Sequence, residues 1–190
     1  MIEHADHFTD LIPGVNTYLT KRNGTVPEPV VHMEQTHGAD CAEVAQFIEK
    51  IPTVDAMYTT QHNLTLAVRT ADCLPILFYH PLPLIGVIHA GRKGTQNNIT
   101  SKTFQKIQAQ YGIEDNFSIW LGPAICFNCY QIDREKDIHF DLIKENLPQL
   151  PANSDMHFSN LCTSCRTDLF FSYRKEGPHT GRIYSLICIV

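Results

Sequence analysis

Two apolar runs in the middle of the chain constrain its fold most strongly. Pro75–Tyr79 and Leu84–His89 are short, dense in aliphatic and aromatic residues, and joined by His80-Pro-Leu-Pro83. Short apolar runs bounded by turn residues are typical of buried strands, and a connection of this length predicts a hairpin. Leu64–Val68 is a similar run just upstream. We therefore expect all three runs to be buried strands.

Helical periodicity dominates the second half of the chain. The predicted helices cover residues 99–111, 138–147 and 161–173. Pro148 ends the second of them, and Asn160 is the expected N-cap of the third. Short apolar runs predict two more strands, over 119–121 and 183–190.

Two parts of the chain carry no clear pattern. Residues 39–51 fit either a strand or a helix, and the turn signals in 1–30 predict no element there. Strands interleaved with helices, several of them in hairpins, indicate an α+β fold rather than a doubly wound parallel sheet. A length of 190 residues suits a single domain, residues 1–190.

Composition and charge limit the partners. The net charge of -5 and the pI near 6.0 oppose nucleic-acid binding, which needs a basic surface. No apolar run approaches the roughly 20 residues that span a bilayer, so no membrane contact is expected. The acidic start of the chain lacks the features of a secretory signal, and the seven cysteines are an odd number. We therefore expect a reducing cytoplasm rather than a disulfide framework.

A cysteine and two histidines accompany the predicted strands. Cys73 precedes one strand, His89 ends the next, and His37 lies in the turn Gln35-Thr-His-Gly38. Three such ligands suit zinc and leave its fourth tetrahedral position for water or substrate, which predicts a catalytic metal site. Taken singly, each residue also fits a buried thiol or a hydrogen-bonded core histidine. A glycine near each histidine allows close backbone approach or a positive φ.

A basic turn, Gly91-Arg-Lys-Gly94, follows the second strand and precedes a predicted helix. Backbone N–H groups and cationic side chains at a helix start can hold phosphate. The spacing is not that of a nucleotide P-loop, and a solvated surface turn explains the pattern about as well.

Two Cys-x-x-Cys pairs offer a rival metal site. They are Cys126-Phe-Asn-Cys129 and Cys162-Thr-Ser-Cys165, with 32 residues between them. That separation exceeds the roughly 15 to 20 residues usual in zinc ribbons. The second pair also falls on a predicted helix, and neither is followed by glycine. These features favour buried thiols over a closed four-thiolate site.

Taken together, the motifs resemble the YfiH-like or laccase-domain family, whose members are described as peptidoglycan editing factor or purine nucleoside phosphorylase. The matching pieces are Gln35-Thr-His-Gly38, Asp55-Ala56, Thr70-Ala-Asp-Cys-Leu-Pro75, His89-Ala-Gly91 with Gly94, Gly122-Pro-Ala-Ile125 with Tyr130, Cys162-Thr163, Phe170-Phe-Ser-Tyr-Arg174 and Gly181-Arg182. They occur in family order over roughly residues 30–190. So many matches in order make the resemblance specific.

The resemblance implies a four-layer α/β/β/α sandwich with a Zn2+ site at His37, Cys73 and His89. It also implies phosphorolysis of adenosine, inosine, guanosine and methylthioadenosine, with adenosine deamination. An older description of the family, as copper-dependent polyphenol oxidases, is the main rival and would replace zinc by copper. The chain departs from the family's His-Ala-Gly-Trp-Arg-Gly, because Arg92 and Lys93 stand for Trp and Arg. Its N-terminal part also looks shortened.

The chemistry assigns further roles. Zinc lowers the pKa of bound water towards about 7, which would supply the hydroxide for deamination. Cys73 and His89 are then the catalytic metal ligands, and neighbouring Asp72 is the candidate for moving protons. Phosphorolysis needs a held phosphate dianion, for which Arg92, Lys93 and Arg174 are the candidates.

Three other functions remain open on the sequence. Cys73 could be the nucleophile of a cysteine hydrolase, with His89 or His37 as its base. The chain could instead be a non-catalytic zinc-binding module. A copper oxidase fits least, because no second group of histidines is evident for dioxygen reduction. The expected partners are purine nucleosides and phosphate, without nucleic acid or membrane, in a monomer or weak homodimer.

Overall fold

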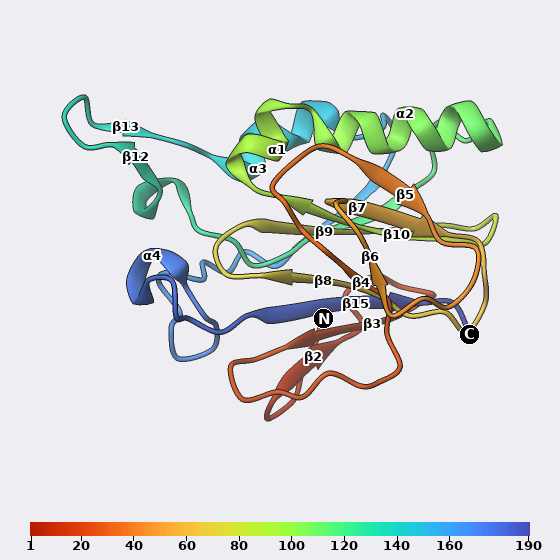
Figure 1. Ribbon diagram of the computed structural model, residues 1–190, viewed down its shortest axis with the longest axis horizontal. Coiled ribbons are helices and arrows are strands. Elements are labelled where there is room, and N and C mark those ends of the chain that lie inside the picture. The colour runs from red at the N-terminus through yellow and green to blue at the C-terminus, as the bar shows by residue number, and fades with distance from the viewer.

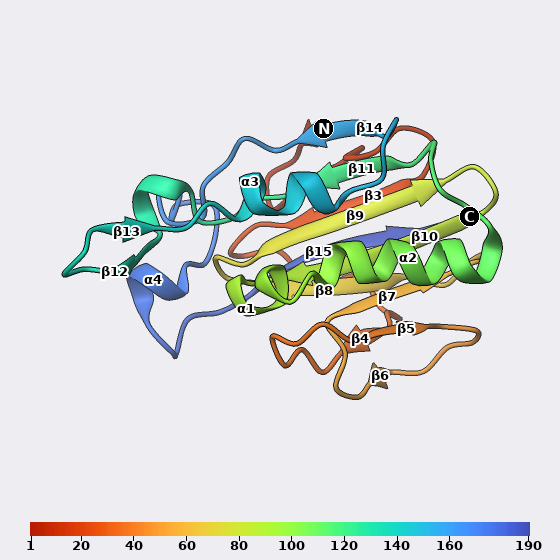
Figure 2. The same ribbon diagram turned by 90° about the horizontal axis from the view of Figure 1, so that it is seen from above.

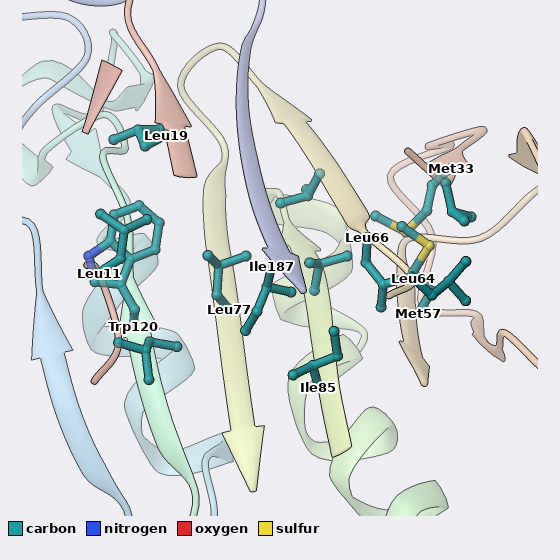
Figure 3. Packing of buried hydrophobic residues seen from close by; sticks show 14 of the residues in the cluster. Leu11, Leu19, Met33, Met57, Leu64, Leu66, Leu77, Ile85, Trp120 and Ile187 are labelled. Carbon is teal, nitrogen blue, oxygen red and sulfur yellow. The ribbon is translucent and has the colours of Figure 1, made fainter. Parts of the chain in front are cut away.

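The computed structural model describes residues 1–190 and confirms the predicted α+β fold. Two sheets pack face to face, and helices cover the outer face of the larger one (Figure 1). Side chains from both sheets form the core between them, among them Leu66, Leu77, Ile85 and Ile187 (Figure 3).

The larger sheet has six strands in the order β14-β11-β9-β10-β7-β5. Their bounds are Asp155–Phe158, Ser118–Leu121, Leu74–His80, Leu84–Ala90, Ala56–Thr59 and Cys41–Glu43. The pairs are antiparallel except β11 with β14 and β5 with β7. The predicted hairpin of β9 and β10 is confirmed, and it lies at the centre of the sheet.

The smaller sheet has five antiparallel strands in the order β1-β2-β3-β15-β8. Their bounds are Ile2–Glu3, His7–Thr9, Asn16–Thr20, Ile183–Cys188 and Leu66–Thr70. Two two-stranded sheets complete the strands, β4 (His32–Met33) with β6 (Lys50–Ile51) and β12 (Gln131–Asp133) with β13 (Ile138–His139).

The helices are short. They are α1 (Arg92–Gln96), α2 (Ile99–Tyr111), α3 (Leu142–Asn146), α4 (Tyr173–Glu176) and the 3-10 turns η1 (Phe127–Cys129) and η2 (Leu147–Gln149). α1, α2 and α3 lie over the six-stranded sheet, whereas α4 and the β12–β13 hairpin gather at one end of the molecule (Figures 1 and 2). None of the helices is both long and apolar enough to cross a bilayer.

Burial on both faces explains the continuous apolar runs of the central hairpin. Leu77 of β9 points into the core between the sheets, while Ile76 and Phe78 pack beneath the helices with Phe104 and Ile107 of α2. A strand covered on both sides has no polar face, so it reads as an unbroken hydrophobic run.

The predicted helix over 161–173 is wrong. That segment forms turns, and only α4 at its end is helical. Cys162 forms a parallel bridge with Ala124, and no helix follows Asn160, so this residue caps none. The apolar residues four apart come from turns whose Leu161 and Leu169 reach the core between the sheets.

Three further segments differ in part from what the sequence predicts. The helix predicted over 138–147 begins only at Leu142, because Ile138 pairs in β13 and the carboxylate of Asp141 caps the helix by accepting from the N–H of Lys144. The ambiguous segment 39–51 contains strands β5 and β6. Residues 1–30, for which no element was predicted, supply three strands of the smaller sheet.

Candidate functional site

The three predicted ligands converge. One ligand atom each from His37, Cys73 and His89 lies within 4.8 Å of the others. Cys73 comes directly before β9, and the β9–β10 register pairs His89 with Pro75, so the hairpin returns the imidazole to the thiol. His37 arrives from the turn after β4 in a left-handed conformation, φ 62°. Its ring meets that of His89 edge to face, with centroids 4.8 Å apart. We call these three residues the open site.

Asp55, for which no role was predicted from the sequence, orients the histidines of the open site. It is fully buried, and its Oδ1 lies 2.7 Å from Nδ1 of His89. Because a carboxylate can only accept, Nδ1 donates, which leaves Nε2 as the ring nitrogen available to a ligand. The same carboxylate accepts from the backbone N–H groups of Thr36, His37 and Gly38. One side chain therefore fixes both histidines.

The charges of the open site are coupled. Burial opposes ionisation of Cys73, but the two imidazoles outweigh it and lower the pKa of the thiol to about 6. Burial likewise opposes the charge on His89, but Cys73 and Asp55 raise its pKa to about 9. Burial works against ionised Asp55 as well, yet His89 and the backbone N–H groups lower its pKa to about 2. A thiolate is thus readily formed here, as metal ligation requires.

Close packing around the open site explains the glycines of the basic turn. A Cβ on Gly91 would lie 3.0 Å from Sγ of Cys73 and 3.1 Å from Cδ2 of His37. A Cβ on Gly94 would lie 2.8 Å from the carbonyl oxygen of Gly38. The close approach expected at glycine is therefore confirmed, whereas the positive φ belongs to His37 and Asp72 instead.

Asp72 links three segments of the chain through hydrogen bonds of its side chain. It is buried, with φ 90°, and its Oδ1 accepts from the hydroxyl of Thr163 at 2.7 Å. Its Oδ2 accepts from the backbone N–H of Arg174 at 2.6 Å. These bonds tie the segment before β9 to α4 and to the turn at 163. The predicted role of Asp72 in moving protons stays a prediction.

The open site lies in a pocket of about 790 Å³ with a cationic wall. The lining includes five basic side chains, Arg69, Arg92, Lys93, Arg174 and Arg182. None of them forms an ion pair. The three predicted phosphate ligands are among them, whereas Arg69 and Arg182 were not predicted to hold phosphate. In a chain of net charge -5, this concentration suits an anionic ligand.

Tyr130 is an aromatic residue in the wall of the pocket, beside Arg174. It lines the pocket, and the guanidinium of Arg174 lies 5.5 Å from the centroid of its ring. Nη1 of Arg174 also donates to the carbonyl of Gln131 at 2.8 Å. A flat aromatic ring beside cations is a suitable wall for an aromatic ligand such as a base.

The four other candidate ligands also come together. Sulfur atoms of Cys126, Cys129, Cys162 and Cys165 all lie within 4.8 Å of one another. None of these residues is fully buried, and Cys165 is exposed. The expectation of buried thiols is therefore wrong. We call these residues the four-thiol cluster.

The fold and the open site define a class of small α+β protein in which three side chains that could hold a metal converge at the end of a buried hairpin, within a cationic pocket. The family described as "Multi-copper polyphenol oxidoreductase laccase" matches residues 15–147 and 135–190. The chain belongs to this laccase-domain family, and the resemblance seen in its motifs is confirmed.

Named relatives agree with that assignment. The chain is 33% identical to "Purine nucleoside phosphorylase YlmD" of Geobacillus stearothermophilus, over 81% of this chain and 70% of that protein. It is 37% identical to "Purine nucleoside phosphorylase ORF3" of Streptomyces griseus, over 84% and 74%. The solved structure of the hypothetical protein YfiH of Bacillus licheniformis shares its fold, with TM-score 0.89, 23% identity and coverage of 100% and 98%.

Proposed function

We propose that the chain is a zinc-dependent purine nucleoside phosphorylase that acts on adenosine, inosine, guanosine and methylthioadenosine and also deaminates adenosine. The observation that carries the proposal is the meeting of three metal-binding side chains and five cations in one pocket. The names of the relatives support purine nucleosides as the substrate class and phosphorolysis as the reaction. The free thiols throughout the chain fit a reducing cytoplasm, where we expect a monomer or weak homodimer.

The donor set fits zinc. One thiolate and two imidazoles are preferred zinc ligands, and the carboxylate of Asp55 on His89 is the usual outer partner of a metal-bound histidine. Bound there, zinc would polarise a substrate oxygen or lower the pKa of a water molecule. A multi-copper oxidase is favoured less, because the second group of potential ligands contains thiols and no histidine.

Phosphorolysis transfers the ribosyl C1′ from a purine nitrogen to a phosphate oxygen. Arg92, Lys93 and Arg174 are proposed to hold the phosphate dianion, with the two guanidinium groups donating pairs of hydrogen bonds. Arg174 is held for this by the bond from its N–H to Asp72. Tyr130 would cover the base, and Asp55 would keep His89 in the required tautomer.

The test is release of purine from adenosine by zinc-replete protein, followed with and without phosphate. We expect adenine and ribose 1-phosphate only when phosphate is present, and inosine from deamination in either case. Base release that ignores phosphate, or inert zinc-loaded protein, would contradict the proposal.

One observation favours a second candidate. Asp55, His89 and Cys73 stand in line as in a cysteine hydrolase, in which the histidine activates the thiol and the acid orients the histidine. Alkylation of purified protein separates the two functions. Zinc bound at Cys73 protects the thiol, whereas a hydrolase nucleophile reacts in the protein as isolated.

A further inference from the structure

We infer that the four-thiol cluster is a second, structural zinc site that fixes one wall of the pocket. Cys126 and Cys129 lie at the two ends of the η1 turn, whereas Cys162 pairs with Ala124 in a bridge and Cys165 lies in the turn that follows it. The inference is independent of the proposed function.

The spacing of the sulfurs matches one tetrahedral ion. Zinc bonded to thiolates at about 2.3 Å keeps the sulfurs roughly 3.8 Å apart. Sγ of Cys129 lies 3.6 Å from Sγ of Cys165, and all four sulfurs lie within 4.8 Å of one another. Four protein ligands fill the coordination sphere, so this site would be closed and structural.

The backbone around the cluster has the form of two facing turns. The carbonyl of Cys126 accepts from the N–H groups of Cys129 and Tyr130, and the carbonyl of Cys162 accepts from the N–H of Arg166. The N–H of Cys126 donates to Sγ of Cys162 across the pair at 3.2 Å. Such N–H to sulfur bonds offset the charge that accumulates on metal-bound thiolates.

Hydrophobic burial does not explain why these thiols gather. None of the four is fully buried, and Cys165 is exposed. Thiolates so close together repel one another unless a cation lies between them. A zinc ion removes that repulsion and links two segments that are far apart along the chain.

The four-thiol cluster is connected to the pocket through the residues that follow Cys129 and Cys162 in the sequence. Tyr130 follows Cys129 and lines the pocket, and Thr163 follows Cys162 and donates to Asp72 at 2.7 Å. The N–H of Ile125, just before the first turn, donates to the carbonyl of Asp72 at 2.9 Å. Asp72 in turn precedes Cys73. The zinc would therefore hold the pocket wall and the strand entry that carries the open site.

The experiment counts zinc in purified protein, before and after removal of one ligand from each site. We expect about two zinc ions per chain in the intact protein and about one in either Cys165→Ser or Cys73→Ser, since each substitution opens one coordination sphere. Cys188→Ser is the matched control, because Cys188 belongs to neither cluster, and it should keep both. Cys73→Ser protein loaded with Co2+ should show intense thiolate-to-cobalt absorption. Adding Cys165→Ser to the same chain should remove that absorption.

A Cys73→Ser protein without zinc and without that cobalt absorption would overturn the inference, as would disulfides among the four cysteines in the mass spectrum. These readouts do not depend on Cys165→Ser being stable. If intact protein and Cys73→Ser both hold about one zinc, the four-thiol cluster is the occupied site. In that outcome the proposed function fails and this inference stands.

Discussion

The open site joins Cys73 and the buried His89, at the ends of two paired strands, to the exposed His37 of a turn, whereas the four-thiol cluster is built from two turns near the surface. The first mixes sulfur with nitrogen, has three ligands and faces a pocket. The second has four sulfurs. The number of protein ligands distinguishes a catalytic metal site from a structural one, because only a metal with an incomplete set of protein ligands can also bind water or substrate. The presence of cysteine in a site therefore does not by itself indicate whether the site is catalytic or structural.

The sharpest test of this difference is removal of a ligand from the open site. Cys73→Ala should lower phosphorolysis by about a thousandfold or more, since loss of the metal removes several kcal/mol of transition-state stabilisation. Steady-state kinetics on inosine with saturating phosphate measure the effect. Cys188→Ser is the control and should leave the rate unchanged. Full activity in Cys73→Ala would end the metal mechanism.

Thiol reactivity in metal-free protein gives the next largest contrast. The neighbouring sulfurs of Cys129 and Cys162 raise the pKa of Cys165 to about 12, whereas the imidazoles lower that of Cys73 to about 6. A larger thiolate fraction outweighs a weaker nucleophile, so Cys73 should alkylate about a hundredfold faster at neutral pH.

The sign of its pH dependence follows from the same values. The rate at Cys73 should rise with pH up to about 6 and then level off, because the thiol is already ionised above its pKa. The rate at Cys165 should keep rising to alkaline pH. Peptide mass spectrometry after timed quenching reads both residues in one sample, and equal rates at neutral pH would contradict the assigned charges.

Asp55→Asn should weaken zinc binding at the open site by about 10- to 100-fold, the usual effect of losing an outer carboxylate partner. Competition with a chelating dye measures the affinity. Cobalt absorption from the four-thiol cluster should stay unchanged, because the hydrogen bonds of the Asp55 side chain go to residues 36–38 and His89 and to none of the four cysteines. Asp137→Asn, which alters an exposed ion pair with His139, is the matched control. An equal loss at both sites would point to general unfolding instead.

The cationic wall predicts the smallest effect. Arg174→Gln should raise the KM for phosphate about tenfold, since one charge-assisted contact is worth about 1.5–3 kcal/mol and is only partly lost. The KM for the nucleoside should change less. Arg134→Gln, on an exposed residue outside the pocket, is the control. An unchanged phosphate KM would remove Arg174 from the phosphate site.

Much of the open site could be predicted from local sequence. The apolar runs of β9 and β10 define a central hairpin, and the positions of Cys73 and His89 at its ends suggest chemistry. Asp55 carried a usable signal, a charged residue inside the apolar segment Val54–Tyr58. Arg182 carried a signal only as part of the family motif Gly181-Arg182, and Arg69 carried none, because only the packing of distant elements brings it to the pocket.

The sequence pattern argued against the four-thiol cluster as a metal site, and this has a physical reason. Apolar residues four apart occur in consecutive turns as well as in helices, so 161–173 gave a false helical pattern. That pattern placed Cys162 and Cys165 on the wrong element and argued against a metal. The strands of residues 1–30 were missed because strand Asn16–Thr20 buries two threonines beside Leu19, which weakens the apolar signal.

Anomalous diffraction at the zinc absorption edge, from crystals of the protein as purified, shows whether the open site binds zinc. We expect a peak bonded to Sγ of Cys73, to Nε2 of His89 and to a ring nitrogen of His37, with a non-protein fourth ligand facing the pocket. A peak completed by a fourth protein side chain, or no peak beside Cys73, would contradict the proposed catalytic zinc site.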